Sequence, residues 1–440
     1  MNVYSYLCFL SALSILIGFF TRKVSDRIQY TIAVTATSMV CSLALIFLGS
    51  LGWFKLDNIA KSIMEAIDFK TFLIDGILGF LLFAGALSIR LPVLKSQTRE
   101  ITALALFSTF ASTFFIGFMI HGITALFGWN FPLVYCLLFG ALISPTDPIA
   151  VLAIIKNLKA PKKLSMKVEG ESLFNDGVGL VIFTTIFAVA FGGQAPTFDG
   201  ITGLFLKEAV GGILFGLVLG FSVHYLVAST SDPSLETLLT LMIPTAGYVL
   251  ADMLHVSGAL SMVVAGIIIG NWTMRNGFSK ANKENFNHFW EMIDHFLNSL
   301  LFLLIGFAML LVDFTVRGIL LSLLAIPICL LCRYISVWIP FKVLGSNTVY
   351  NPYTLKILTW GGLRGGLSLA MALSIPSGVI MIDSVGMDIH DLLVVMTYGV
   401  VLFAILVQGT TIERMIRKSK DVIMAERGYV GLKGKTKRVN

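Results

Sequence analysis

Long uninterrupted apolar runs constrain this chain more than any other feature. A transmembrane helix needs about 20 mostly apolar residues, and runs of this length recur along most of the 440-residue sequence. Of all residues, 56% are hydrophobic and only 13% are charged, whereas a soluble domain carries about 25% charged residues. A soluble enzyme and a disordered chain are therefore excluded. Membrane β-barrels show shorter, alternating segments, so the sequence predicts an all-α polytopic membrane protein.

We place thirteen membrane spans along the chain. They cover residues 3–20, 29–49, 71–89, 101–127, 131–155, 165–191, 207–229, 234–254, 257–271, 288–311, 315–341, 353–378 and 390–411. Residues 1–412 are accordingly assigned to one transmembrane domain, and residues 413–440 to a short basic cytoplasmic tail. Residues 51–70 mix apolar and charged side chains, which fits an amphipathic helix lying at the membrane interface.

The basic residues are concentrated in the loops on one side of the membrane, if the chain crosses it at each of these spans. Cytoplasmic loops of membrane proteins are enriched in Lys and Arg. Arg333 and Arg364 lie within spans, and one side holds only Lys55, Lys61, Lys70, Lys207 and Arg317. All the others among the 32 Lys and Arg residues fall on the opposite side or in the tail. This distribution places the N-terminus outside and the C-terminus in the cytoplasm. It also accounts for the net charge of +7 without nucleic acid as a partner.

The fifth span contains two prolines, Pro145 and Pro148, on either side of Thr146 and Asp147. Proline removes a backbone donor and disfavours helix at the preceding residue, so we expect a broken helix here. Unwound backbone persists within a membrane only where it is buried in protein or lines a watery cavity. Freed carbonyls, the Thr146 hydroxyl and the Asp147 carboxylate are therefore candidate cation ligands. The alternative is a simple proline kink with Asp147 snorkelling to the interface.

The sixth span carries two acids, Glu171 and Asp176, together with Ser172 and Asn175. Glu171 and Asn175 are i,i+4 neighbours, as are Ser172 and Asp176, so the helix presents two adjoining polar strips. Hard cations prefer oxygen ligands, and a carboxylate also accepts a proton. One carboxylate flanked by hydroxyl and amide oxygens can hold Na⁺ or H⁺ but not both. The alternative is a structural hydrogen-bond network between helices.

The twelfth span contains Gly361-Gly362-Leu363-Arg364-Gly365-Gly366. Each glycine destabilises a helix by about 1 kcal/mol relative to alanine and permits unwinding or close helix packing. Arg364 cannot lose its proton at any relevant pH, so within the membrane it needs a carboxylate partner. Arg364 can equally hold structure within a packing glycine cluster, and that alternative is compatible with a cation site nearby.

The fifth and twelfth spans run in opposite directions in this topology. Interrupted helices in corresponding positions of two halves are typical of an inverted-repeat transporter with its site near the midplane. The carboxylates of Asp147, Glu171 and Asp176 outnumber Arg364, and the excess negative charge suits exchange of a metal cation for a proton. Arg333, deep in the eleventh span, is expected to bind backbone carbonyls or an unidentified acid.

Glu291, Asp294 and His295 cluster at the inner start of the tenth span. Because His titrates near neutral pH, this cluster either senses pH or gates transport, or it is plain interfacial charge. The sequence contains no GxxxxGK[ST] loop, so ATP-driven transport is not expected.

We expect no cofactor and no enzymatic activity. An intramembrane aspartyl protease would need a GxGD motif around Asp147 or Asp176, and neither aspartate lies in such a motif. A cation channel needs sites weak enough for ions to leave rapidly, whereas a deep carboxylate beside Arg364 favours obligatory exchange.

Several stretches of the sequence resemble one family. GALISPTDPIAVLAIIK, GESLFNDGVGLVIF and GGLRGGLSLAMAL look like blocks of the monovalent cation:proton antiporter-1 family, the sodium/proton antiporters and exchangers. FWEMIDHFLNSLLFLLIGF and LLFAGAL resemble further family blocks, and the resemblance covers roughly residues 70–410. It implies a thirteen-helix inverted-repeat fold, with the fifth and twelfth helices broken and crossing, that usually forms a homodimer.

The resemblance also implies a function and a set of site residues. The chain would be a secondary active antiporter of a bacterial cell membrane that exchanges Na⁺, or Li⁺, for H⁺ and serves pH homeostasis. Asp176 would be the carboxylate that binds either Na⁺ or H⁺. Thr146, Asp147 and Ser172 would lie near the transported ion, and Asn175 would hold the geometry of the site.

The resemblance further implies an ion pair between Glu171 and Arg364 at the site. The Asn175–Asp176 pair resembles the electroneutral branch of the family, and the short tail looks bacterial. One position departs from the pattern, because Ala84 stands where relatives often carry a glutamate that helps the ion path. K⁺/H⁺ exchange remains the alternative function, since oxygen ligands around one carboxylate do not decide ion size.

Overall fold

The computed structural model describes residues 3–24, 30–50, 64, 68–129, 131–158, 162–192, 198–279, 282–312, 314–344, 352–382 and 386–418. Most of the amphipathic helix predicted over residues 51–70 lies outside these ranges, as does the basic tail from residue 419 onward. Both of these features stay predictions.

The described residues are almost entirely helical. The first part of the chain forms α1 (Val3–Val24), α2 (Tyr30–Ser50), η1 (Thr71–Ile77), α4 (Leu78–Leu87), α5 (Leu91–Ser96), α6 (Thr98–Thr102), η2 (Ala103–Phe107), α7 (Ser108–Leu126), α8 (Leu133–Ile143), α9 (Ile149–Asn157) and α10 (Lys162–Phe191). Here η marks a short π-helical or 3₁₀-helical stretch. These stretches continue neighbouring α-helices, so several of the spans are composite.

The second part of the chain is also built of α-helices with short π-helical or 3₁₀-helical stretches, and it adds one short hairpin. Its helices are α11 (Phe198–Ala228), α12 (Pro233–Leu241), η3 (Ile243–Gly247), α13 (Tyr248–Met253), α14 (Gly258–Ile268), η4 (Ile269–Thr273), α15 (Met274–Asn276), α16 (Asn282–Phe307), η5 (Ala308–Leu311), α17 (Val316–Leu344), α18 (Pro352–Trp360), α19 (Gly366–Leu373), α20 (Ile389–Phe403) and η7 (Ala404–Gln408). Strands β1 (Met381–Ile382) and β2 (Met387–Asp388) pair antiparallel, with Met381 opposite Asp388.

Eight helices within the described ranges are long and apolar enough to cross a membrane. Three shorter apolar helices accompany them, at Ser5–Phe20, Thr71–Leu87 and Leu133–Ile143. Helices satisfy their own backbone hydrogen bonds, which lipid cannot do. The all-α polytopic fold is confirmed, and the exact count of thirteen crossings stays a prediction.

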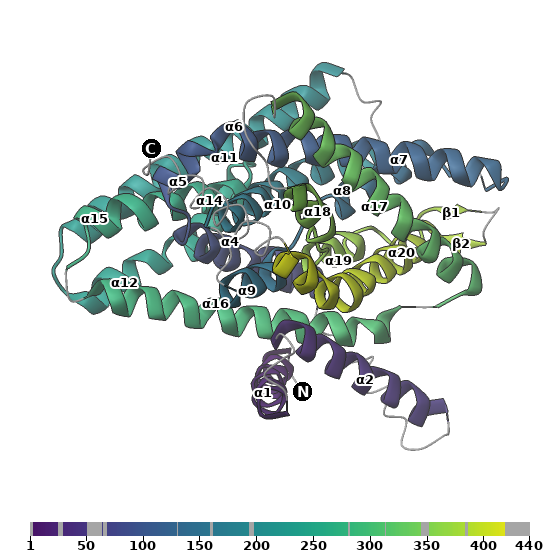
Figure 1. Ribbon diagram of the computed structural model, residues 1–440, viewed down its shortest axis with the longest axis horizontal. Helices are drawn as coiled ribbons and strands as arrows, with labels where there is room; N and C mark the ends of the chain where they lie inside the picture. Colours follow the sequence, from purple (N-terminus) through teal and green to yellow (C-terminus); the bar gives the residue numbers. More distant parts are fainter. Residues whose placement is uncertain are drawn as a thin grey trace, which may run out of the picture.

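The long helix α16 organises the arrangement shown in Figure 1. It runs along the length of the molecule, with α1 and α2 packed on one side of it and the remaining helices on the other. The Tyr30 hydroxyl of α2 shares a 2.7 Å hydrogen bond with Ser299 of α16, and Ser42 donates to the Gly306 carbonyl at 3.1 Å. These polar contacts, which are buried between apolar helices, fix α2 against α16.

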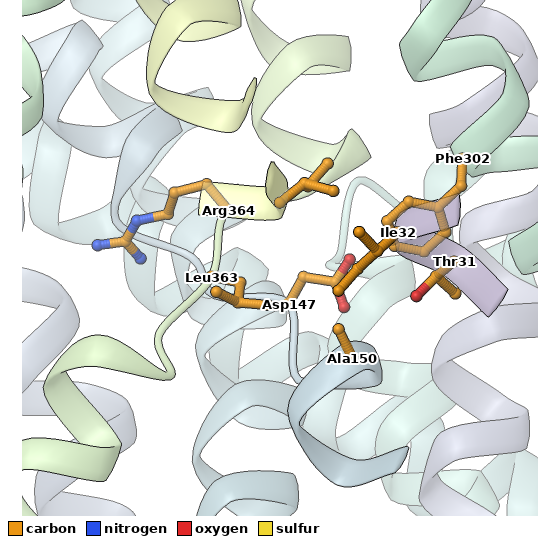
Figure 2. Close-up of a pocket in the computed structure, with 8 residues that line it drawn as sticks. Thr31, Ile32, Asp147, Ala150, Phe302, Leu363 and Arg364 are labelled. Atoms are coloured by element: carbon orange, nitrogen blue, oxygen red, sulfur yellow. The ribbon is translucent and has the colours of Figure 1, made fainter. Parts of the chain in front are cut away.

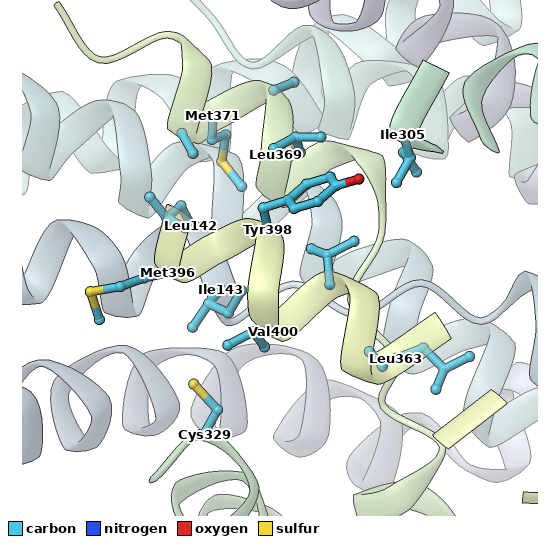
Figure 3. Close-up of a cluster of buried hydrophobic side chains, with 14 of the residues drawn as sticks. Leu142, Ile143, Ile305, Cys329, Leu363, Leu369, Met371, Met396, Tyr398 and Val400 are labelled. Atoms are coloured by element: carbon cyan, nitrogen blue, oxygen red, sulfur yellow. The ribbon is translucent and has the colours of Figure 1, made fainter. Parts of the chain in front are cut away.

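A cluster of buried apolar side chains holds the ends of the interrupted helices (Figure 3). Tyr398 of α20 is fully buried in this cluster, and its hydroxyl donates to the Gly306 carbonyl of α16 at 3.5 Å. Ile143, at the end of α8, and Leu363 and Leu369, on either side of the α19 start, are buried in the same cluster. The chain ends that frame the site are therefore anchored in a packed apolar core.

The outer helices expose large apolar side chains. Leu206, Leu214 and Val218 of α11 are each more than half exposed. Soluble proteins rarely expose contiguous apolar surface on this scale. A lipid environment around α11 explains the exposure.

Candidate ion-binding site

Two helical spans are interrupted at the same place. α8 ends at Ile143 and α9 begins at Ile149, while α18 ends at Trp360 and α19 begins at Gly366. Between them, the Asp147 N–H donates to the Leu363 carbonyl at 2.8 Å, as an isolated antiparallel bridge. The predicted break in each of these spans is confirmed.

Glycines allow the two unwound segments to approach. A Cβ atom built at Gly365 would lie 2.8 Å from the Asp147 Cβ, which is closer than real Cβ atoms approach. One built at Gly362 would lie 3.2 Å from the Thr146 Cγ2, which is tighter than nearly all real Cβ contacts. The absence of a Cβ at these two positions therefore permits the close approach, and glycine also disfavours helix there.

Helix α10 holds the unwound fifth span through Thr146. Asn175 donates from Nδ2 to the Thr146 hydroxyl at 2.8 Å and accepts from the Thr146 N–H at 3.2 Å. The Ser172 hydroxyl donates to the Thr146 carbonyl. Asn175 and Ser172 are at most 2% exposed. Every polar atom of Thr146 is thus bonded to α10, and the two segments form one rigid polar unit.

The two aspartates beside this unit differ in their surroundings. Asp147 accepts a 2.9 Å hydrogen bond from the Ile149 N–H at the start of α9. Asp176 is half-buried, and no described residue forms a hydrogen bond or ion pair with its side chain. Because each aspartate directly follows a residue of the Thr146–Asn175 pair, the two carboxylates belong to the same small region. The charges that act on Asp176 there are those of Asp147 and Arg364.

Figure 2 shows the direction in which Asp147 points. Its carboxylate faces Thr31 and Ile32 of α2 and Phe302 of α16, whereas the Arg364 side chain leaves the adjacent segment in the opposite direction. These residues, with Ala150, Leu363 and Ile405, line a small cavity. Thr31 and Phe302 were not among the residues predicted from the sequence, because no local motif marks them.

Arg364 substitutes for backbone donors that the fifth span lacks. Its Nη1 donates to the carbonyls of Ser144 and Pro145, at 2.8 Å each. In an unbroken helix the Ser144 carbonyl would accept from residue 148, but that residue is a proline without an N–H. The Pro145 carbonyl would accept from Ile149, whose N–H is instead bonded to Asp147. Arg364 therefore caps the broken end of α8.

The ion pair of Glu171 differs from the one expected. Glu171 pairs with Arg333 of α17, not with Arg364, and both partners are at most 3% exposed. Arg333 also donates to the Ser108 hydroxyl at 3.1 Å and to the Leu358 carbonyl at 3.3 Å. The expectation of a Glu171–Arg364 pair is corrected on this point. The Arg364 guanidinium binds the Ser144 and Pro145 carbonyls instead. Glu171 is the acid that was expected, but not identified, as a partner of Arg333.

Comparison with known proteins agrees with this arrangement. The family model described as sodium/hydrogen exchanger, transmembrane, matches residues 9–418. The chain belongs to the sodium/hydrogen exchanger family. The resemblance inferred from the sequence blocks is thereby confirmed.

Relatives of this exchanger cover nearly its whole length. The Na⁺/H⁺ antiporter NhaP of Pseudomonas aeruginosa is 42% identical over 396 residues, which span 89% of this chain and 91% of the relative. The Na⁺/H⁺ antiporter NhaH of Halobacillus dabanensis is 35% identical over 388 residues, which span 86% and 91%. The structure of the sodium proton antiporter MjNhaP1 from Methanocaldococcus jannaschii matches with a TM-score of 0.73 at 18% identity, over 94% of this chain and 98% of that one. This last likeness shows the fold.

Ala84 lies in α4, which packs against α10, the helix that bears Asp176. Alanine has no side-chain oxygen, so this position of α4 adds no carboxylate to those of Asp147 and Asp176.

Proposed function

We propose that this exchanger is a secondary active antiporter that exchanges Na⁺ for H⁺, with Asp176 as the group that binds either one. The observation that carries the proposal is a half-buried Asp176 carboxylate without a protein partner among the described residues, beside the rigid Thr146–Asn175 unit. A buried charge normally pairs with another protein group. A carboxylate left unpaired among oxygen-bearing neighbours suits an exchangeable cation or proton.

The ligand set of the transported Na⁺ follows from this arrangement. Asp176 and Asp147 supply carboxylate oxygens, and Thr146 and Ser172 supply hydroxyl oxygens whose remaining lone pairs can accept a cation. Asn175 positions Thr146 and leaves the charge of the site unchanged. Arg364 and the Glu171–Arg333 pair hold the surrounding helices, and Arg364 also limits the negative charge of the site.

The exchange is proposed to be electroneutral because one carboxylate alternates between the two cargoes. Sodium is preferred to potassium as the cation because the relatives described above are named Na⁺/H⁺ antiporters. The K⁺/H⁺ alternative is not favoured. A homodimer in the bacterial cell membrane, with the N-terminus outside and the C-terminus in the cytoplasm, completes the proposal.

The test is transport into liposomes that contain a pH-reporting dye. A Na⁺ gradient should drive proton movement in the wild-type protein, with Li⁺ and K⁺ compared in the same assay. Asp176→Asn keeps the size of the side chain but removes the titratable charge, so exchange should be lost while folded protein remains in the membrane. Asp199→Asn, an exposed carboxylate at the start of α11, is the matched control and should transport normally.

Two outcomes contradict the proposal. Na⁺-driven proton movement by folded Asp176→Asn would remove Asp176 from the central role. Equal or faster proton movement driven by K⁺ in the wild type would overturn the assignment of Na⁺.

A further inference from the structure

A polar stripe on α16 leads to the cavity that Asp147 faces. Asp294, Asn298 and Phe302 are spaced by four residues, so they lie on one side of the helix over about 12 Å. Phe302 lines the Asp147 cavity (Figure 2), and Asp294 lies midway along α16 (Asn282–Phe307), near the inner start of the span predicted over residues 288–311. The stripe therefore extends from the Asp147 cavity toward the side that the predicted topology places at the cytoplasm.

Asn298 is the unusual member of this stripe. It is 4% exposed, and its Nδ2 donates to Asp294 Oδ1 at 2.9 Å. Its Oδ1 is buried and has no hydrogen-bond partner within the described ranges. Exchanging the amide nitrogen and oxygen would not help, because two acceptors would then face each other. A buried acceptor without a partner costs about 1–3 kcal/mol, and such groups mark places where an ion or water binds.

Charged groups from two helices act electrostatically on Asp294, which is half-buried. Glu291 and His295 lie on its own helix, and the exposed Lys156 lies near the end of α9. Asp294 also acts electrostatically on Asp147, which precedes the start of α9. Helices α9 and α16 both line the Asp147 cavity, through Ala150 and Phe302. Residues of both helices therefore lie around Asp147, and the same two helices carry the charged groups that act on Asp294.

We propose that Asp294 and Asn298 form a second cation subsite on the route between the cytoplasm and Asp147. The Asp294 carboxylate and the Asn298 Oδ1 would hold a partly hydrated monovalent cation before it passes Phe302. This inference rests on the proposed antiport, because only a transported cation needs such a route. Lys156 competes with the cation for Asp294, since it brings a fixed positive charge to the same carboxylate.

The first test measures the apparent KM for Na⁺ separately on the two sides, in vesicles of opposite orientation. Asp294→Asn should raise KM by roughly threefold to tenfold, as expected for loss of one favourable charge at a partly screened site. The rise should occur only on the side where α16 begins, and the maximal rate should change less than twofold. Glu284→Gln removes an exposed negative charge in the first turn of α16, ten residues from Asp294, and should leave both KM values unchanged.

The second test separates cation binding from a structural role. Asn298→Ala should raise the same KM as Asp294→Asn does, because it removes the unpaired amide oxygen. If Asp294 served only to hold Lys156, Lys156→Ala would reproduce the effect of Asp294→Asn. Under the proposal, Lys156→Ala removes a competing charge, so KM on that side should fall or stay the same.

Two results would overturn the subsite. One is an unchanged KM in Asp294→Asn; the other is an equal rise of KM on both sides. Asp294 is half-buried, so Asp294→Asn is expected to fold even if Asn298→Ala does not. Loss of exchange in Asp176→Asn together with normal KM in Asp294→Asn would reject the subsite and leave the antiport proposal standing.

Discussion

The backbone N–H of Asp147 donates a 2.8 Å hydrogen bond to the carbonyl of Leu363. The two residues come from unwound segments that lie more than 200 positions apart in the sequence. The next residue, Arg364, donates to the carbonyls of Ser144 and Pro145. Each broken span therefore supplies hydrogen-bond partners that the other has lost.

We expect Gly365→Ala to reduce exchange strongly. The added Cβ would collide with the Asp147 side chain and push the two unwound segments apart, at a cost of about 1–3 kcal/mol for overpacking. Transport in liposomes and the melting temperature in detergent measure both effects. Gly122→Ala in α7 is the control, because no atom lies within 4 Å of a Cβ built there. Normal transport in Gly365→Ala would show that the close approach of the segments is dispensable.

The Glu171–Arg333 pair predicts a double-mutant cycle with strong coupling. Removal of one partner from a buried pair costs about 3–5 kcal/mol, because the other charge stays buried without compensation. Glu171→Ala and Arg333→Ala should each lower the melting temperature in detergent sharply, and the double variant should recover part of the loss. The Glu171/Arg364 cycle is the comparison and should show weaker coupling. Additive losses for Glu171 and Arg333 would contradict the pairing.

The broken helices and the residues around Thr146 could be predicted because their signals are local. Pro145 and Pro148 lack backbone donors, and neighbouring glycines weaken the twelfth span, so both breaks follow from the sequence. The polar residues of α10 are i,i+4 neighbours on one helix, and Ser172 and Asn175 do meet Thr146. The whole region depends on short-range chemistry that a single sequence displays.

The partners of the buried arginines could not be predicted, because they depend on how distant helices pack. Arg333 and Arg364 lie on different spans, and both are deep in the membrane. Nothing in residue spacing decides which of them reaches Glu171. Thr31 and Phe302 were missed for the same reason, since each enters the Asp147 cavity from a helix whose sequence carries no local signal there.

The fold should tolerate loss of the Arg364 charge better than loss of the Arg364 hydrogen bonds. Arg364→Ala leaves the Ser144 and Pro145 carbonyls unpaired, and each buried unpaired group costs about 1–3 kcal/mol. Arg364→Gln keeps an N–H donor, so its melting temperature in detergent should fall less than that of Arg364→Ala. Equal losses in the two variants would indicate that the charge, and not the capping of α8, is what stabilises the fold.

Protons and Na⁺ should compete for one site. If Asp176 binds either cargo but not both, lowering the pH on one side should raise the apparent KM for Na⁺ on that side without lowering the maximal rate at saturating Na⁺. Initial rates in liposomes over a grid of pH and Na⁺ concentration measure this directly. A maximal rate that falls with pH while KM stays constant would instead indicate a separate inhibitory proton site.

The last prediction concerns the charge moved in each cycle. Asp176 is the carboxylate proposed to change its cargo, and its neighbour Asn175 is neutral. Asp147 accepts a hydrogen bond at the start of α9, and Glu171 is neutralised by Arg333, so neither is expected to carry a second proton. One Na⁺ then exchanges for one H⁺, and no net charge crosses the membrane. A membrane potential imposed with valinomycin and K⁺ should therefore change neither the rate nor the end-point of exchange in liposomes. If the end-point followed the potential, a second titrating group would have to take part, even if Asp176 were essential.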